Sequence, residues 1–223
     1  MKTGELILAL ALLAPSARAA EAQPPPAPAR AMADTSGFLP RWLHASVDAG
    51  PGWMQAPAVV RSRYTVGLSA ALDLAVRPAR GVTLAVRADY MDLPAGTLRY
   101  VTDPTSGRTV PLAAISDVGH GSLFAPMGVV AIRAGGSWWA EVGAGMAYFH
   151  SGLAAFDFLD PGTGGIVHVP DESGWGPAMN AGVRFDFQPN ARDRLYLMGR
   201  VCGTRRADRR LVFLSLRVGY RIP

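Results

Sequence analysis

The sequence predicts an all-β protein, an eight-stranded antiparallel up-and-down transmembrane β-barrel with short periplasmic turns and long extracellular loops. Three observations lead to this prediction. Segments of about ten residues repeat with a period of two, which is the length and pattern of a strand that crosses a bilayer. The connections between them alternate between short and long, and aromatic residues fall near the segment ends.

The N-terminal part of the chain is predicted to lie outside the barrel. Lys2, the apolar run 6–14 and the small residues of PSARAA are typical of a secretory signal peptide, assigned to residues 1–19. Residues 20–40 include QPPPAPAR, a composition that favours a disordered, extended leader. The barrel then takes residues 41–223.

The segment 64–76 shows the strand pattern most clearly. Its even-numbered positions are mostly large and apolar, whereas its odd-numbered positions are small or charged and include Asp73. Strand side chains alternate between two faces, so this pattern predicts one apolar face and one small or charged face. The eight predicted strands cover residues 41–49, 64–76, 82–90, 123–133, 138–149, 179–187, 195–202 and 212–222. Pro126 cannot donate to a strand ladder and therefore predicts a bulge or a strand start.

The predicted connections sort into two kinds. RPARG, AGG and QPNARD are short, whereas residues 93–122 and 151–175 form long connections. Short turns at one end and long loops at the other are typical of an up-and-down barrel in a bacterial outer membrane.

The second face of the strands indicates what fills the barrel. The outside of a soluble barrel would carry broad polar side chains, but this face is mostly Gly, Ala and Ser with charges of both signs. Small residues and paired charges suit the interior of a narrow barrel, so the apolar face is predicted to meet lipid. The predicted lumen charges are Asp73, Arg87, Asp89, Glu141, Arg184, Asp186, Arg200, Arg217 and Arg221.

Aromatic residues support the same orientation. If the N-terminus lies in the periplasm, two groups of rings fall at the two membrane interfaces, where amphipathic rings are favoured. The outer group is Tyr64, Tyr90 and Tyr148, and the inner group is Trp138, Phe187 and Tyr220.

Three stretches carry a family resemblance: WAEVGAGMAYF, SGWGPAMNAGVRFDF and LSLRVGYRIP. With them the chain resembles the small outer-membrane barrels of Gram-negative bacteria, OmpA/OmpX-like overall and OmpW-like in the C-terminal third. The resemblance implies a barrel that reaches the outer membrane after signal-peptide export. The chain departs from these families at its last residues, Ile222 and Pro223, where an aromatic residue is usual.

Catalysis is not expected. Some barrels of this size resemble lipid deacylases, which need a Ser and a His side by side, but His150 and Ser151 are neighbours in sequence and point to opposite faces of a regular strand. The loop residues Asp157, Asp160, His168, Asp171 and Glu172 match no ordered metal motif and predict an acidic, hydrated loop. We expect no metal and no cofactor.

An arginine cluster is the sharpest surface feature. Arg205, Arg206, Arg209 and Arg210 are predicted to lie in the outward loop between the last two strands. Arginine binds phosphate groups bidentately, so the cluster is a candidate contact for lipopolysaccharide, with a solvated turn as the alternative.

The expected function is a non-enzymatic role in the envelope, structural or through surface contacts, with lipid and lipopolysaccharide as partners. A lumen of eight strands can be filled by side chains, which argues against an open pore. The first alternative is OmpW-like passage of small hydrophobic molecules, and the second is a soluble periplasmic binder of an apolar ligand. The net charge of +5 suits phosphate-bearing partners, but nucleic acid is excluded as a partner because an exported chain rarely meets it.

Overall fold

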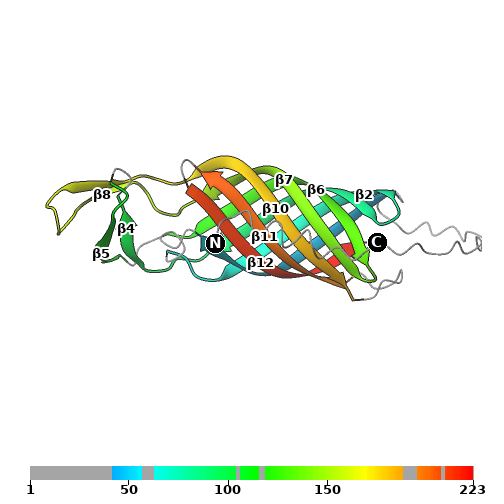
Figure 1. Cartoon of the computed structure of the whole chain (residues 1–223). Coiled ribbons are helices and arrows are strands. Elements are labelled where there is room, and N and C mark those ends of the chain that lie inside the picture. The colour runs from blue at the N-terminus through cyan, green and yellow to red at the C-terminus, as the bar shows by residue number, and fades with distance from the viewer. Residues whose placement is uncertain are drawn as a thin grey trace, which may run out of the picture. The chain divides into compact units, whose positions relative to one another are not determined.

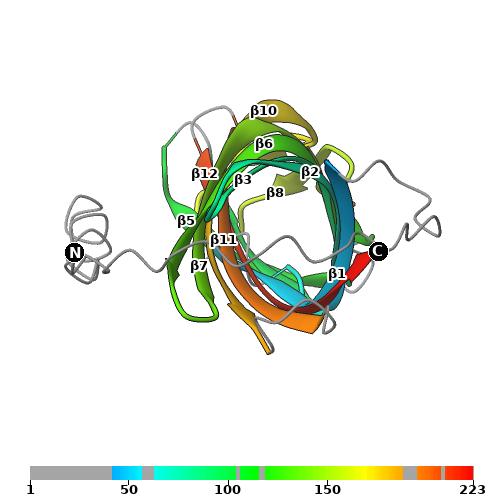
Figure 2. The ribbon, with the colours of Figure 1, turned by 90° about the vertical axis from the view of Figure 1, so that its right-hand side faces the viewer.

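The computed structural model describes residues 42–56, 63–103, 106–115, 119–187, 195–206 and 209–222. The predicted signal peptide and leader lie outside these residues. The described chain forms a closed antiparallel barrel of eight strands, which confirms the predicted fold class (Figures 1 and 2). Around the barrel the order is β1-β12-β11-β10-β7-β6-β3-β2. The strands are β1 (Leu43–Ala56), β2 (Gly67–Ala79), β3 (Val82–Leu93), β6 (Gly121–Gly135), β7 (Trp138–His150), β10 (Gly174–Asp186), β11 (Leu195–Arg206) and β12 (Arg209–Ile222).

Two short hairpins lie within the long connections. The hairpin of β4 (Leu98–Thr102) and β5 (Thr109–Ile115) follows β3, and the hairpin of β8 (Phe156–Leu159) and β9 (Ile166–Val169) follows β7. Both lie beyond the same end of the barrel (Figure 1). Leu98, Val101 and Val169 are buried together in a small core between them. The sequence predicted only loops here, because four- and five-residue strands show too few alternations to stand out.

The two ends of the barrel differ in their connections. At one end, here called the turn end, β2 joins β3 through Arg80 and Gly81, and β6 joins β7 through Gly136 and Ser137. Gly81 and Gly136 have φ of 81° and 51°, a backbone conformation that favours glycine in tight turns. The other end, here called the loop end, carries the two extra hairpins. β11 and β12 also meet at the loop end, but only residues 207–208 separate them.

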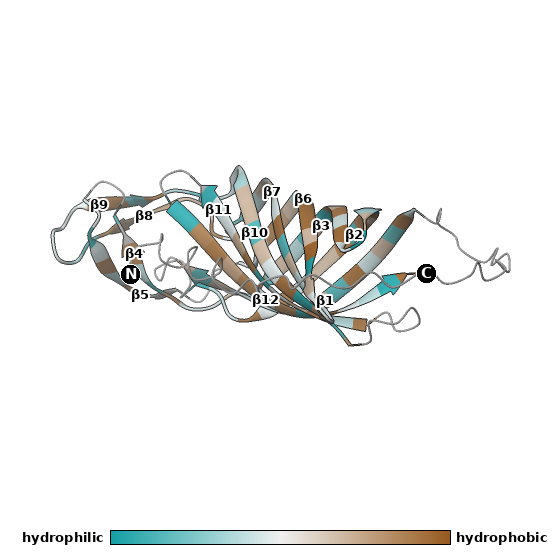
Figure 3. Cartoon of the chain, turned by 45° about the vertical axis from the view of Figure 1, so that its right-hand side comes forward, coloured by the Kyte–Doolittle hydropathy of each residue, from teal (hydrophilic) through white to brown (hydrophobic). Residues whose placement is uncertain are grey.

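The strands follow the predicted alternation. In β2, Ser69, Ala71 and Asp73 are buried, whereas Leu68, Leu72 and Leu74 are exposed. The same alternation of apolar and polar positions is visible along the other strands (Figure 3). Because the barrel is closed, buried positions face its interior and exposed apolar positions face outward.

Glycine makes room where interior side chains are large. A Cβ atom added at Gly219 would lie 2.1 Å from Cζ of Tyr196, whose ring is buried on the neighbouring strand. β12 therefore accepts only glycine here without moving the tyrosine.

Pro126 lies in the middle of β6, so the predicted bulge or strand start is wrong. Ala125 and Pro126 are both paired with β3, but the pairing with β7 skips these two residues and resumes in the same register at Met127. The missing N–H of proline interrupts the β7 ladder without displacing the strand.

Candidate functional site

The middle of the lumen holds a buried network of arginines and carboxylates. Arg87 is bidentate to two partners: its Nε and Nη2 donate to Asp73 at 2.5 and 2.7 Å, and its Nη1 and Nη2 donate to Glu141 at 2.6 and 3.1 Å. Asp73 and Arg87 lie opposite each other in the β2–β3 pairing. The tight turn of the β2–β3 hairpin therefore sets the register that brings the side chains of Asp73 and Arg87 together.

Two further arginines connect strands that are distant in sequence. Arg200 donates to Glu141 at 3.0 Å and to Asp89 at 2.7 Å. Arg217 donates to Asp48 at 3.0 Å and to Asp89 at 2.5 Å. Three arginines and four carboxylates thus share one network, and all are 5% exposed or less. Buried charges require this kind of pairing, and the network ties most of the barrel wall together.

The loop-end half of the lumen is apolar. Its buried cluster includes Met91, Leu123, Phe149 and Phe213, each at most 3% exposed. Tyr64 packs edge-on against Phe149 and donates its hydroxyl proton to the carbonyl oxygen of Ser151. Side chains therefore fill this half of the barrel.

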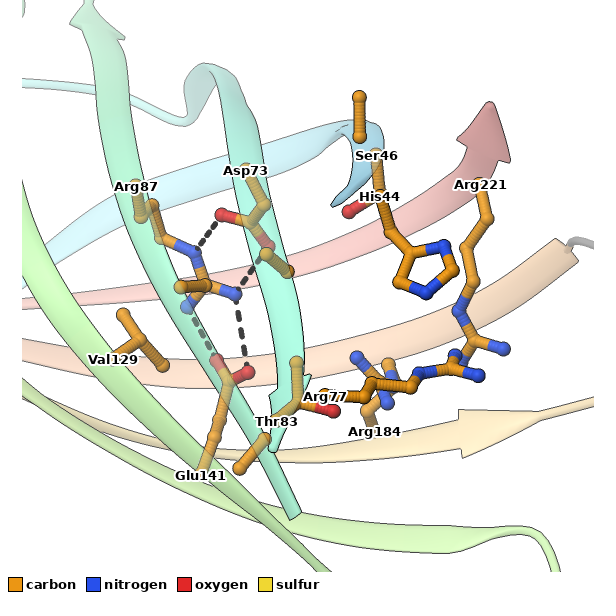
Figure 4. Close-up of a pocket in the computed structure, with 14 residues that line it drawn as sticks. His44, Ser46, Asp73, Arg77, Thr83, Arg87, Val129, Glu141, Arg184 and Arg221 are labelled. Carbon is orange, nitrogen blue, oxygen red and sulfur yellow. Dashed lines mark hydrogen bonds and ion pairs between the residues drawn. The ribbon is translucent and has the colours of Figure 1, made fainter. Parts of the chain in front are cut away.

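The turn-end half contains a cavity among charged side chains (Figure 4). Arg77, Arg184 and Arg221 line it together with His44 and Thr83. Asp186 lies beside it and accepts hydrogen bonds from Arg221 at 2.5 Å and from Nε1 of Trp139 at 2.9 Å. Nε of Arg184 lies 3.2 Å from the same carboxylate.

The structure places the nine predicted lumen charges as follows. Eight are buried inside the barrel, and Arg221 is partly exposed at the turn end, where it pairs with Asp186. The nine charges fall into two groups. Arg184, Asp186 and Arg221 pair with one another and form no ion pair with the central network among the described residues.

Sequence reasoning missed Asp48, Arg63 and Arg77. Asp48 lies within the predicted strand 41–49 on the same face as Ser46, so the alternation contained the signal. Arg77 belongs to the small or charged face of its strand but was left out of the predicted set. Arg63 lies outside any strand and offered no such signal.

The predicted arginine cluster lies on strand ends and not in a loop. Arg205 pairs with Arg210, and Arg206 with Arg209, as β11 and β12 continue to residues 206 and 209. Antiparallel pairing extends the hairpin further than the apolar pattern indicated. Arg205 and Arg210 are exposed, whereas Arg209 forms an ion pair with Glu172. Glu172 also accepts a hydrogen bond from the buried Arg63 at 3.2 Å.

One predicted girdle residue is corrected. Tyr64 is 8% exposed and points inward, because β2 begins only at Gly67 and the alternation does not extend back to residue 64. Tyr90 is exposed as expected. The ring of Tyr148 lies tilted against that of Trp175, with centroids 5.4 Å apart, and Trp175 in turn contacts Phe124. At the turn end Trp138, Phe187 and Tyr220 are all exposed, and Phe185 lies between the first two.

The residues around His150 form no catalytic triad. Oγ of Ser173 lies 3.3 Å from Nδ1 of His150 and from Oγ of Ser151, but the carboxylate of Asp171 accepts from Ser151 and from the Ser173 backbone instead of from the histidine. These hydrogen bonds to Ser173 and Ser151 hold the pKa of Asp171 below its ordinary value. A nucleophilic serine needs its base oriented by the third group, so this arrangement holds the loop in place.

The acidic loop residues are dispersed. Asp157 contacts His168 at 2.6 Å on the β8–β9 hairpin, while Asp160 accepts from Gly162 and Thr163 within its own turn. Within the described ranges, no three His, Cys, Asp or Glu side chains come close enough to hold a metal ion. The described residues also contain no helix long and apolar enough to cross a membrane.

Fold and lumen together define the class: a closed eight-stranded barrel with a filled, charged interior and an apolar exterior. No protein-family model matches the chain, and a search of curated proteins finds no match. Several solved structures are similar to this chain at low sequence identity. The outer-membrane protein Ail of Yersinia pestis is 13% identical, with a TM-score of 0.47 over 80% of this chain and 98% of Ail. The N-terminal barrel domain of OprF from Pseudomonas aeruginosa is 13% identical, with a TM-score of 0.41 over 80% and 96%. Neisserial surface protein A is 13% identical, with a TM-score of 0.42 over 81% and 96%.

Proposed function

We propose that this protein is a non-catalytic integral outer-membrane barrel that acts in the envelope as a structural and surface-contact element. The observation that carries the proposal is the apolar outer face. Every barrel strand has large apolar side chains that are exposed, while the charges in the middle of the barrel are buried beside them, as with Val86 beside Arg87 and Val142 beside Glu141. A soluble protein rarely exposes apolar surface on this scale, whereas a membrane barrel requires it.

Strand length supports the same proposal. The barrel strands contain between 12 residues, as in β3, and 15 residues, as in β6. About 9–11 residues suffice to cross the hydrocarbon layer as a tilted strand. The aromatic contacts of Trp175 and of Trp138 then suit the two interfaces.

A filled lumen supports a structural role over transport. The central network and the apolar cluster occupy successive layers of the interior. The arginines and carboxylates that make up the network are almost completely buried. An open channel for solutes needs a larger number of strands or an empty layer, and neither is present among the described residues.

One observation favours hydrophobic passage as a second candidate. The interrupted β6–β7 ladder at Ala125 and Pro126 lies beside the apolar cluster, where a lateral exit from the lumen would have to form. Passage would require the side chains of Phe149 and Phe213 to move aside. A filled cluster therefore makes this the weaker candidate.

Lipopolysaccharide contact is proposed for Arg205 and Arg210. Both guanidinium groups are exposed on the loop-end hairpin, where arginine forks match phosphate groups. Arg209 is left unchanged in this test because it forms an ion pair with Glu172, and replacing it would also disturb that contact. Replacing Arg205 and Arg210 by Gln should lower the amount of co-purified lipopolysaccharide, and an unchanged amount would refute the contact.

The proposed function is tested by fractionating the envelope and running the outer-membrane fraction on gels with and without boiling. A heat-dependent change in migration in that fraction is expected. Conductance in planar bilayers should stay at the level of a protein-free membrane. Protein found only in the soluble periplasmic fraction would refute the proposal and favour the soluble binder.

A further inference from the structure

The turn-end cavity holds more positive than negative charge. Arg77 comes from β2, Arg184 from β10 and Arg221 from β12, so three neighbouring regions of the barrel deliver guanidinium groups to one cavity (Figure 4). Asp186 is the carboxylate that pairs with two of them. The nearby carboxylates Asp73 and Glu141 are already bound by Arg87. Counted with Arg87, the four arginines of the cavity face three carboxylates, Asp73, Glu141 and Asp186, which leaves one net positive charge among the described residues.

Two buried polar groups on the cavity wall also lack hydrogen-bond partners. The side chain of Arg184 is 9% exposed, and its Nε lies 3.2 Å from the Asp186 carboxylate as an ion pair without hydrogen-bond geometry. Oγ1 of Thr83 is buried without a partner as well. Buried donors that lack hydrogen bonds are costly, so these two groups, and Thr83 above all, point to a ligand that is itself polar.

Aromatic rings fix the orientation of these arginines. The guanidinium of Arg184 lies over the ring of Trp139 at 4.8 Å and over that of Tyr196 at 5.5 Å. Arg221 lies over the same tyrosine at 5.8 Å. Stacking on a ring leaves the edge of a guanidinium free to donate, so these contacts prepare both groups for bidentate binding.

We propose that the turn-end cavity binds a phosphate-class oxyanion. Arginine forks match the spacing of phosphate oxygens, the net positive charge of the cavity favours an anion, and Thr83 offers a further donor. The enclosed space is about 30 Å³. This volume suits a ligand about as small as a single phosphate group. The phosphate group belongs either to a free small molecule or to a lipid head group, which share this chemistry. This site goes beyond the proposed envelope role and does not depend on it.

The test is isothermal titration of the full chain, refolded in phosphate-free maltoside micelles, with inorganic phosphate and with monomeric short-chain phosphatidic acid. Binding of either probe is expected, and the tighter one identifies the source. Arg184→Gln and Arg221→Gln should each weaken binding about tenfold or more. Arg77→Gln, at the exposed rim, should weaken it without affecting folding.

Asp186→Asn distinguishes a binding site from a merely structural cluster. Removing the one carboxylate that competes for these arginines should tighten phosphate binding, even if the barrel becomes less stable. The matched control is Arg80→Gln, because Arg80 is an exposed arginine of the turn end that does not line the cavity. The proposal is overturned if neither probe binds at millimolar concentration. It is equally overturned if Arg80→Gln weakens binding as much as the cavity variants, or if Asp186→Asn fails to tighten it.

Discussion

Removing Arg87 should destabilise the barrel strongly, and mainly through Asp73. Arg87 makes four hydrogen bonds to two buried carboxylates. After Arg87→Met, Glu141 still has Arg200 at 3.0 Å. Asp73 has no other hydrogen-bond or ion-pair partner among the described residues. Breaking a buried ion pair by removing one partner costs about 3–5 kcal/mol, because an uncompensated charge stays in the low-dielectric interior.

The assay is unfolding by urea in lipid vesicles, followed by tryptophan fluorescence and by the gel shift on boiling. Arg87→Met should lower the free energy of unfolding by about 3–5 kcal/mol. The double variant Arg87→Met/Asp73→Asn should recover about 1–3 kcal/mol of that loss, because it removes the orphaned charge. Arg80→Met is the control and should stay within about 0.5 kcal/mol of wild type. A single variant within about 1 kcal/mol of wild type, or a double variant no better than the single one, refutes this reasoning.

Three further predictions concern packing and the loop end. Gly219→Val should prevent folding, seen as loss of the gel shift, because its Cβ would overlap the Tyr196 ring, whereas Gly199→Ala, with nothing within 4 Å, should fold normally. Trp175→Ala removes two aromatic contacts and should cost about 1–3 kcal/mol in urea unfolding; a loss below about 0.5 kcal/mol would contradict the girdle assignment. The lowered pKa of Asp171 means that its hydrogen bonds stabilise the loop above the ordinary aspartate pKa of about 4 and are lost as pH falls through the lower folded value. The protection factors of the amides of residues 151–173, measured relative to intrinsic exchange at the same pH, should therefore fall in that acidic range in the wild type, and Asp171→Asn should abolish this pH dependence.

The sequence predicted the barrel because period-two patterning directly reports which face is buried. It also contained one of the ion pairs: the short β2–β3 turn places Asp73 opposite Arg87. The pairs of Arg200 with Asp89 and of Arg217 with Asp48 depend on barrel closure and on side chains crossing the lumen. No local pattern encodes those contacts.

The remaining differences have local causes. β1 continues through Gly50, Pro51 and Gly52 to Ala56, residues that usually end a strand, so the prediction stopped at residue 49. Pro51 is tolerated where the barrel wall supplies the surrounding ladder. Tyr64 has a residue type that suits an interface, but it precedes the first residue of β2. Its hydroxyl group donates to the carbonyl oxygen of Ser151 instead.

The seam between β1 and β12 joins the first and last strands of the barrel, whose residues lie far apart in the sequence: Asp48 and Arg217 are separated by 169 positions. A slip of one residue along this seam would turn Asp48 onto the apolar outer face and leave Arg217 with Asp89 as its remaining partner. Such a misaligned barrel would place an unpaired carboxylate on its apolar outer face. Misregistered closure is therefore penalised at the final step of assembly, and the acid–base pair acts as a check on alignment that apolar residues alone would not supply.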